Sequence, residues 1–312
     1  MQPKISVVSP AHNEAGNLPE FVRRADEALK KITSDFEIII VDDGSTDNTW
    51  DLLTKLKQKY LHLKAIKLRR KSGQTAAIMA GFEAAGKDIV VVYDADLQQD
   101  PAEIGQLIEP IKSGRADVVS GWRKKRQHSL SIKIIAAIER VFNRWFLGLS
   151  LHDTAVSPNA YRRQCLQGLN LYGEMHRFLV AILFWRGWRV IEVPVHHFPR
   201  RSGTSHYQAT KAFGGFLDLL IVKFWQDFSI RPIRLFGGIG MILLVLGIGL
   251  GLEEAIRKLV FDLSIYNRTL PLLAAFLAIV GIQFLILGIL ADIMVRIYYK
   301  KSKNYQIEKT IE

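Results

Sequence analysis

Cysteine is nearly absent from this chain, since Cys165 is the only one among 312 residues. A single cysteine cannot form a disulfide within the chain, and no metal-binding side chains accompany it in the sequence, so we expect it to be a small buried side chain. No signal peptide precedes the first apolar segment, which favours a cytoplasmic amino-terminal domain. No nucleic-acid-binding signature occurs, so nucleic acid is not expected as a partner.

Two common nucleotide-binding motifs are also missing. The sequence has no G-x-x-x-x-G-K-[S/T] phosphate loop, and no G-x-G-x-x-G follows its first predicted strand. A P-loop kinase and a classical dehydrogenase are therefore not expected. What remains is a nucleotide site that handles a diphosphate through a bridging metal ion.

Long apolar runs are present near the carboxyl end. Residues 235–252 contain no charge, and residues 270–291 are interrupted only by Gln283. At about 1.5 Å per residue, each run can cross a hydrocarbon core about 30 Å thick. We therefore predict two transmembrane helices, with two buried core helices as the alternative.

The charges that flank these runs predict their orientation. The net charge is +12, and positive residues lie outside both runs: Arg231 and Arg234 before the first, and Arg296, Lys300, Lys301 and Lys303 after the second. By the positive-inside rule, both ends of the chain are expected in the cytoplasm, with the protein as a multi-pass inner-membrane protein. The excess charge favours an anionic lipid surface as a partner.

Strand and helix patterns alternate along the first half of the chain. Apolar strand-like segments such as "ISVVSP", "FEIIIVDD", "LKAIKL", "DIVVVYDAD" and "ADVVSGW" are separated by helical spacings. This order predicts an α/β fold with a mostly parallel sheet. We expect a catalytic domain over 1–206, interfacial helices and a linker over 207–234, a transmembrane hairpin over 235–297 and a basic tail over 298–312.

Polar side chains recur where the predicted strands end. If "DIVVVYDAD" continued as a strand, Asp94, Asp96 and Gln98 would share one face, and an oxygen-only cluster of this kind suits Mg²⁺ or Mn²⁺. Taken alone, the segment fits a solvated turn equally well. However, acids also follow the two earlier strands, at Glu14 and at Asp42 and Asp43, which favours a ligand site at this edge.

The ordered set of motifs resembles family 2 glycosyltransferases with the GT-A fold. The segments concerned are "VVSPAHNEAGNL", "IIIVDDGSTDNT", "KSGQTAAIMAGFEAA", "DADLQQDP" and "EVPVHHFPRRSGTSHY". With two carboxyl-terminal spans, the chain is similar to polyprenyl-phosphate glycosyltransferases, the group of dolichol-phosphate mannose synthase and the bactoprenol glucosyltransferases. This resemblance implies a metal-dependent, inverting hexose transfer, with UDP-glucose as the expected donor and undecaprenyl phosphate as the acceptor.

The resemblance also implies roles for individual residues. The metal would be held by Asp94, Asp96 and Gln98. The nucleotide would be bound by Pro10, His12, Asn13, Glu14, Asp42, Asp43 and Asp94, with His12 at a position where an aromatic residue is usual. Asp153 is a catalytic candidate, with a turn-capping role as the alternative.

The acceptor is expected to need cations more than a base, because a lipid monophosphate is already ionised near neutral pH. Arginine suits two-point contact with phosphate. The candidates are Arg123, Lys124, Arg200 and Arg201, with Arg123 and Arg201 also proposed for catalysis, and a membrane-surface patch is the alternative. Glu174 and His176 are left open between a catalytic and a packing role.

Several questions stay open at this level. Amphipathic segments at 129–150 and 210–229 fit the membrane interface or the core. The donor could instead be GDP-mannose or a UDP-amino sugar, and the chain could be a non-catalytic binding protein. A processive synthase is disfavoured because no Gln-x-x-Arg-Trp motif is present. The oligomeric state is not fixed, with a homo-oligomer as one expectation.

Overall fold

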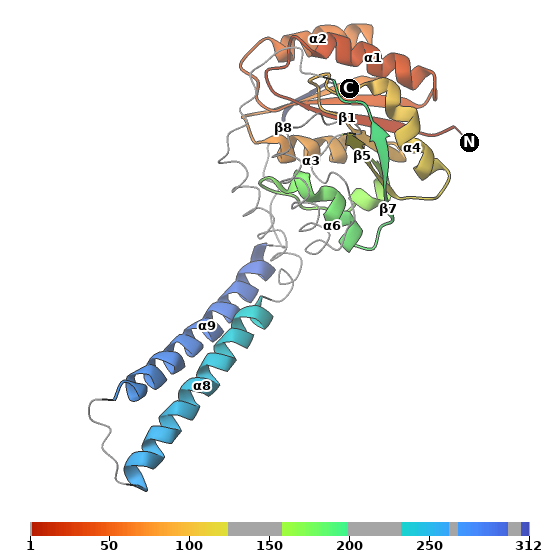
Figure 1. Ribbon diagram of the computed structural model, residues 1–312. Coiled ribbons are helices and arrows are strands. Elements are labelled where there is room, and N and C mark those ends of the chain that lie inside the picture. The colour runs from red at the N-terminus through yellow and green to blue at the C-terminus, as the bar shows by residue number, and fades with distance from the viewer. Residues whose placement is uncertain (1, 124–157, 199–231, 262–267, 299–306, 312) are drawn as a thin grey trace. The chain divides into compact units, whose positions relative to one another are not determined.

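The computed structural model describes residues 2–123, 158–198, 232–261, 268–298 and 307–311 (Figure 1). The chain forms two units, one comprising residues 1–218 together with 303–312, and the other residues 219–302. Each unit is described by itself.

The first unit is built around a mixed sheet of eight strands within the described residues. The strand order is β7-β5-β6-β4-β1-β2-β3-β8. Most neighbours are parallel, while β6 runs antiparallel to β4 and β5, and β8 runs antiparallel to β3. The strands are β1 (Ile5–Ala11), β2 (Phe36–Asp42), β3 (Leu63–Leu68), β4 (Ile89–Val92), β5 (Val118–Arg123), β6 (Asn159–Arg162), β7 (Val190–Val195) and β8 (Ile307–Ile311).

Helices cover both faces of this sheet (Figure 1). One face packs against α1 (Leu18–Lys30), α2 (Thr49–Lys59) and α4 (Ile104–Lys112). The other face carries α3 (Gln74–Ala84), which contacts β1 and β2, and α6 (Leu179–Trp185), which contacts β5 and β7. Among its described residues the unit also contains three short 3-10 helices: η1 (Pro101–Glu103), η2 (Arg163–Leu166) and η3 (Met175–Phe178).

The central strands are buried because they lie between these two helical layers. All seven residues of β2 are buried, and so are six of the seven in β1. On α1, the apolar stripe that begins with Leu18 and Phe21 faces this core, as its spacing predicts. On the opposite face α3 crosses β1 closely at Gly81, where an added Cβ would lie 2.2 Å from Cγ1 of Val8.

Cys165 is buried, as expected for a structural thiol. It is 1% exposed, and burial raises its pKa to about 11, so it is a protonated side chain near neutral pH. Such a thiol is unreactive.

The prediction of a mostly parallel α/β sheet is confirmed, but two antiparallel strands were not predicted. Strand β6 covers only four residues and carries no alternating pattern. Strand β8 lies in the segment that the sequence suggested to be a basic tail, and it pairs with the edge of β3, from Ala65 opposite Ile311 to Leu68 opposite Ile307.

The expectation that Asp94 and Asp96 stand on a continuing strand is wrong. Strand β4 ends at Val92, and the segment that follows is a loop in which Leu97 has a φ of 59°. Within this loop, Asp96 Oδ1 accepts a hydrogen bond from the backbone N–H of Gln98 at 3.1 Å, a local contact that an extended strand does not make. Short acidic side chains compete in this way with the pairing of a strand.

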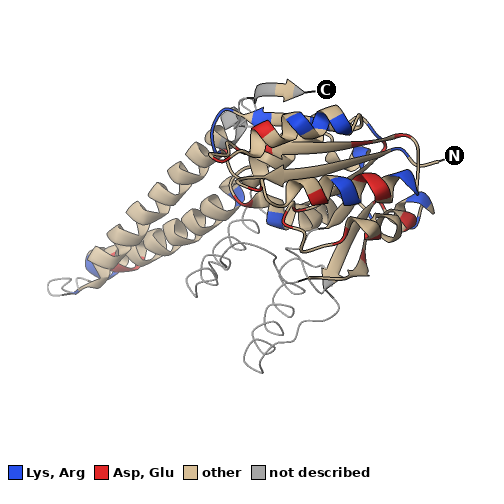
Figure 2. Cartoon of the chain, turned by 90° about the horizontal axis from the view of Figure 1, so that it is seen from above, with Lys and Arg blue, Asp and Glu red and all other residues tan. Residues whose placement is uncertain are grey.

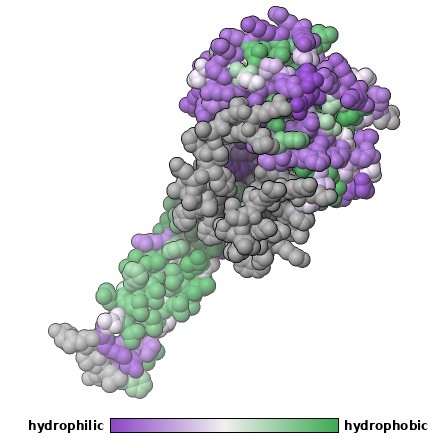
Figure 3. All heavy atoms as spheres, turned by 45° about the horizontal axis from the view of Figure 1, so that its top comes forward, coloured by the Kyte–Doolittle hydropathy of each residue, from purple (hydrophilic) through white to green (hydrophobic). Residues whose placement is uncertain are grey.

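The second unit contains two long apolar helices, α8 (Ile233–Leu259) and α9 (Leu270–Tyr298). Both are long and apolar enough to cross a membrane, as expected from the sequence. Their outer surface is hydrophobic (Figure 3), and charged residues cluster at the end where α8 finishes and α9 begins (Figure 2). At that end, Arg268 and the buried Glu254 form an ion pair of 2.7 Å.

Small residues allow these two helices to approach closely. A Cβ at Gly240 would lie 2.7 Å from the carbonyl oxygen of Gly281, and a Cβ at Gly247 would lie 2.6 Å from the backbone nitrogen of Ala278. Because the obstructing atoms belong to the backbone, no side-chain rotation could relieve the contact. Close backbone approach at small residues is a common way to join helices in membranes.

We predict that Gly247→Val separates α8 from α9 and destabilises the hairpin by about 1–3 kcal/mol, as overpacking does elsewhere. Gly249→Val is the matched control, since nothing lies within 4 Å of a Cβ at that position on the same helix. Thermal unfolding of the detergent-solubilised protein should show a lower midpoint for Gly247→Val only. Equal midpoints in the two variants would show that the helices do not depend on this contact.

Candidate active site

The carboxyl ends of the parallel strands meet at one edge of the sheet. Strands β1, β2, β3 and β4 are mutually parallel, and β5 points the same way because both β4 and β5 are antiparallel to β6. The loops that follow these strands therefore gather at the same edge, which is where open α/β sheets bind their ligands. Arg123 is the last residue of β5 and pairs with Val195 at the end of β7.

The loops after β1 and β2 are bound to each other. Asn13 adopts a left-handed backbone with a φ of 57°, accepts a hydrogen bond from the N–H of Thr46 at 2.9 Å, and donates its own N–H to Ser45. His12 Nδ1 lies 2.8 Å from the carbonyl oxygen of Asp43, to which it donates. The two loops therefore form one rigid rim.

Asp42 and Asp43 are both buried at the end of β2. The carboxylate of Asp43 accepts hydrogen bonds from the N–H groups of Ser72 and Gly73, at 2.6 and 2.9 Å, and so holds the loop after β3. Asp42 Oδ1 accepts the N–H of Ser45 at 2.9 Å. Its other oxygen has no hydrogen-bond partner among the described residues.

A buried acceptor without a partner costs about 1–3 kcal/mol. The open oxygen of Asp42 is therefore suited to accept a hydrogen bond from a ligand. Close packing of the neighbouring loop fixes its surroundings, because Gly44 has a φ of 61° and an added Cβ there would lie 2.5 Å from the backbone of Arg70.

The loop after β4 brings a second pair of acids to this edge. Asp94 Oδ1 accepts a hydrogen bond of 3.0 Å from Nε2 of Gln74, the first residue of α3. Asp96 is 8% exposed, and Gln98 is half-buried beside it in the same loop. The start of α3 is thus joined both to Asp43, through Ser72 and Gly73, and to Asp94.

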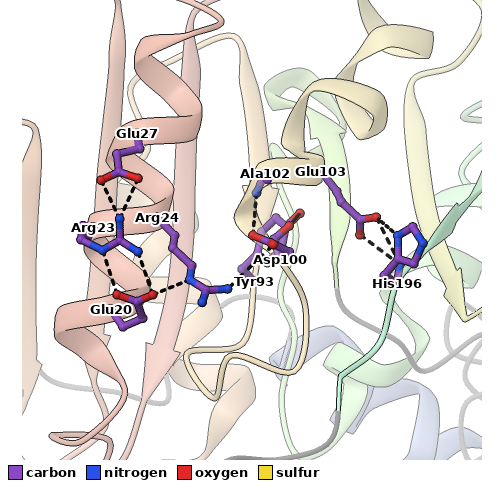
Figure 4. Close-up of polar contacts among 9 residues, drawn as sticks. All are labelled: Glu20, Arg23, Arg24, Glu27, Tyr93, Asp100, Ala102, Glu103 and His196. Carbon is purple, nitrogen blue, oxygen red and sulfur yellow. Dashed lines mark hydrogen bonds and ion pairs between the residues drawn. The ribbon is translucent and has the colours of Figure 1, made fainter.

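Contacts on the outer side hold the same loop in place (Figure 4). Arg24 of α1 lies 3.8 Å from Asp100, whose Oδ1 caps η1 by accepting the N–H of Ala102 at 3.1 Å. Hydrogen bonds from Arg23 and Arg24 lower the pKa of Glu20 to about 2, so this carboxylate stays charged and orients both arginines.

The segment after β7 binds the far side of this loop. Glu103 accepts the N–H of His196 at 3.1 Å and contacts its Nδ1 at 2.6 Å (Figure 4). Two residues later, the N–H of Phe198 donates to the carbonyl oxygen of Gln98 at 2.8 Å. The chain that leads into "PRRSG" therefore leaves the sheet beside Gln98.

His176 and Glu174 differ in their surroundings. Glu174 is exposed and pairs with Arg177 at 3.0 Å. His176 Nδ1 lies 2.7 Å from Oγ1 of Thr75, and the Thr75 hydroxyl donates to the carbonyl oxygen of Gly173 at 2.6 Å. Burial lowers the pKa of His176 to about 4, so its imidazole is neutral near neutral pH.

The structure brings most of the sequence-predicted residues to one edge. These are Pro10, His12, Asn13, Glu14, Asp42, Asp43, Asp94, Asp96 and Gln98. Arg123 ends a strand at that edge, but its side chain is outside the described residues. Asp153, Lys124, Arg200 and Arg201 also lie outside them, as do both amphipathic segments.

Sequence reasoning missed two residues that the structure places here, Gln74 and Thr75. Their signal was positional, because both begin the helix that follows β3. The first residues of a helix after a parallel strand lie at the ligand-binding edge.

The donor atoms of this edge fit a hard divalent cation. Asp94, Asp96 and Gln98 offer only carboxylate and amide oxygens, which Mg²⁺ and Mn²⁺ prefer. No group of three or more His, Cys, Asp or Glu residues gathers as a metal cluster in the described part of the chain. A cation held here would therefore need further oxygens from a bound ligand, as the phosphates of a nucleotide supply.

A mostly parallel sheet with an Asp-x-Asp loop beyond its fourth strand is the arrangement of GT-A glycosyltransferases. The model of the family "Glycosyl transferase family 2" matches residues 6–164, and the chain belongs to this family. A dodecaprenyl-phosphate galacturonate synthase of Rhizobium johnstonii is 32% identical, over 99% of this chain and 93% of that protein. An undecaprenyl-phosphate 4-deoxy-4-formamido-L-arabinose transferase of Yersinia enterocolitica is also 32% identical, with 99% and 94% covered.

These relatives confirm the resemblance to polyprenyl-phosphate glycosyltransferases. Among solved structures, a glucosyl-3-phosphoglycerate synthase of Mycobacterium tuberculosis is similar in fold, with a TM-score of 0.54 and 19% identity over 72% of this chain and 78% of that one. It was crystallised with Mn²⁺, UDP and phosphoglyceric acid, and the same enzyme also with Mg²⁺ and UDP. At this identity the likeness supports the fold alone.

We predict that Asp43→Asn releases the loop after β3. The carboxylate receives two backbone N–H groups, whereas an amide can accept with only one of its two ends. Amide hydrogen exchange at Ser72 and Gly73 should accelerate about tenfold or more, because the loss of one hydrogen bond to a charged group lowers the free energy of local opening by about 1.5 kcal/mol or more. Asp51→Asn on the exposed face of α2 is the control and should change neither rate. Unchanged exchange in Asp43→Asn would contradict the role given to this residue.

Proposed function

We propose that this enzyme transfers glucose from UDP-glucose to undecaprenyl phosphate, with inversion at the anomeric carbon and with Mg²⁺ or Mn²⁺ bound. The observation that carries the proposal is the joining of three loops at one edge: Asp43 holds the start of α3, and Gln74 there holds Asp94. In this proposal the nucleotide would bind at the loops after β1 and β2 and the diphosphate at the acidic loop after β4, and these loops are connected through the start of α3.

The chemistry of this edge suits a diphosphate leaving group. A divalent cation at Asp94, Asp96 and Gln98 would neutralise the diphosphate as its bond to the sugar breaks. The oxygen of Asp42 that lacks a partner in the described part of the chain would accept a hydrogen bond from the base or ribose. In the same step, a phosphate oxygen of the lipid bonds to the anomeric carbon, and UDP leaves with both electrons of the broken bond.

The acceptor needs position rather than deprotonation. We assign its phosphate to Arg123, Lys124, Arg200 and Arg201, and keep Asp153 as a candidate for contact with the sugar or the reacting phosphate. Two observations support this assignment. Arg123 ends β5 at the ligand-binding edge, and the chain toward Arg200 passes Gln98 at Phe198. The lipids named for the relatives, dodecaprenyl and undecaprenyl phosphate, support the class of acceptor.

The identity of the transferred sugar can be tested directly with a panel of nucleotide sugars. Purified protein with undecaprenyl phosphate should form a labelled lipid product with UDP-glucose, and less product with UDP-galacturonate, a UDP-amino sugar or GDP-mannose. Asp96→Asn should reduce the rate at least a hundredfold while the protein stays folded, and excess chelator should do the same to the wild type.

Asp51→Asn is the control for that loss and should keep the wild-type rate. If another nucleotide sugar is preferred, the glucose assignment is wrong while the reaction class stands. If no nucleotide sugar gives a lipid product but UDP still binds, the chain is a non-catalytic binding protein.

We further propose that α8 and α9 cross the inner membrane and that both termini face the cytoplasm. We propose a catalytic domain over 1–206, interfacial segments over 207–234, the hairpin over 235–297 and a tail over 298–312, of which residues 307–311 return to the sheet as β8. Besides the flanking charges, the pairing of β8 with β3 supports this arrangement. Two strands of one sheet lie in the same compartment, so the chain between them must cross the membrane an even number of times.

Cysteine labelling tests this topology in a Cys165→Ala background. Thr269→Cys, at the start of α9, should react with an impermeant maleimide in intact cells. Thr310→Cys, in β8, should react only after the cells are opened. Both threonines are exposed and receive the same substitution. The opposite pattern, or equal labelling of both, would refute the orientation.

A further inference from the structure

The proposed reaction gives no role to the half-buried imidazole of His176, which lies at the ligand-binding edge. It is bonded to Thr75, the second residue of α3, whose neighbour Gln74 is bonded to Asp94. The imidazole therefore belongs to the connected structure that positions the acidic loop. It comes from η3, about a hundred positions further along the chain, which contacts α3.

The protons of this cluster can be assigned from its geometry. Thr75 Oγ1 lies 2.6 Å from the carbonyl oxygen of Gly173, which can only accept, so the single hydroxyl proton points there. The other contact of Oγ1, to His176 Nδ1 at 2.7 Å, must then use a proton on Nδ1. In a neutral imidazole this leaves Nε2 with a lone pair and no proton.

A lone pair on Nε2 restricts what the imidazole can bind. Diphosphate oxygens and an ionised lipid phosphate carry only acceptors, so neither can satisfy it. The hydroxyl groups of a sugar are the donors that the reaction brings to this region. Gln74, the residue before Thr75, donates to Asp94, so the start of α3 contacts both the imidazole and the acidic loop.

We propose that His176 is a specificity-determining residue whose Nε2 accepts a hydrogen bond from a hydroxyl of the transferred sugar, with Thr75 fixing the tautomer that makes this contact available. The proposal rests on the proposed function. It explains why a neutral imidazole, rather than a cation, stands beside a site for anions. It also predicts selection for a hydroxyl and against a carboxylate at the same place on the sugar.

Two substitutions separate this role from simple packing. His176→Asn keeps an N–H near the position of Nδ1 for the bond to Thr75 but has no atom at the position of Nε2. His176→Gln can place an amide oxygen near the position of Nε2. If Nε2 binds the sugar, kcat/KM for UDP-glucose should fall about tenfold in His176→Asn and stay within about threefold of wild type in His176→Gln. A residue that only holds the loop would give the reverse order.

Deoxygenated donors identify the hydroxyl. For the wild type, kcat/KM should fall about tenfold when one particular hydroxyl is removed from the glucose of the donor. In His176→Asn, removal of that hydroxyl should leave kcat/KM unchanged, whereas removal of any other hydroxyl should have the same effect as in the wild type. The 2-, 3-, 4- and 6-deoxy forms of UDP-glucose make the series. Calorimetric titration should give the same affinity for UDP in the wild type and in both His176 variants, because UDP lacks the glucose that is transferred.

The outcomes are distinct from those of the main proposal. Wild-type protein that forms no lipid product with any donor refutes the proposed function. If the wild type is active and each of the four deoxy donors lowers kcat/KM by the same factor in His176→Asn as in the wild type, only the role of His176 is refuted. Wild-type kinetics in His176→Asn, equal losses in both variants, or a loss of UDP affinity would refute it as well.

Discussion

A carboxylate can be buried only where other groups supply its hydrogen bonds, and this constraint organises the whole ligand-binding edge. Asp43 is satisfied by backbone N–H groups from the loop after β3, whereas Asp42 has a partner among the described residues at only one oxygen, an N–H from its own loop. The bonds of Asp43 fix a segment that is about 30 positions away in the sequence. Because the start of α3 is held by Asp43 and in turn holds Asp94, the position of the acidic loop after β4 depends on the end of β2, two strands away in the sheet. Rigidity at the site is thus a consequence of burying its charges.

Much of this arrangement could be predicted from the sequence, because its signals are local. The apolar stripe from Leu18 on α1, the buried run of β2 and the two long apolar helices each follow from the spacing of their own residues. The grouping of Asp42, Asp43 and Asp94 follows from one rule about parallel strands. The failure at β4 has a local cause too, since hydrophobic pattern alone cannot show where aspartate side chains take over the hydrogen bonds of the backbone.

Other features could not be predicted because they depend on contacts between distant segments. Thr75 and His176 are 101 positions apart, and neither lies in a motif that points to the other. Strand β6 is too short to show alternation, and β8 is recognised only by its partner. Likewise, the small residues at Gly240 and Gly247 look like ordinary glycines in an apolar run until α9 is placed against them.

Strand β8 has a consequence for how the protein is made. Its partner β3 lies in the first quarter of the chain, yet Ala65 pairs with Ile311, next to the last residue. During synthesis the edge of β3 stays unpaired until both apolar helices and the residues of β8 have left the ribosome. Open strand edges are prone to join other chains. The eighth strand can therefore join the sheet only after both apolar helices have been synthesised.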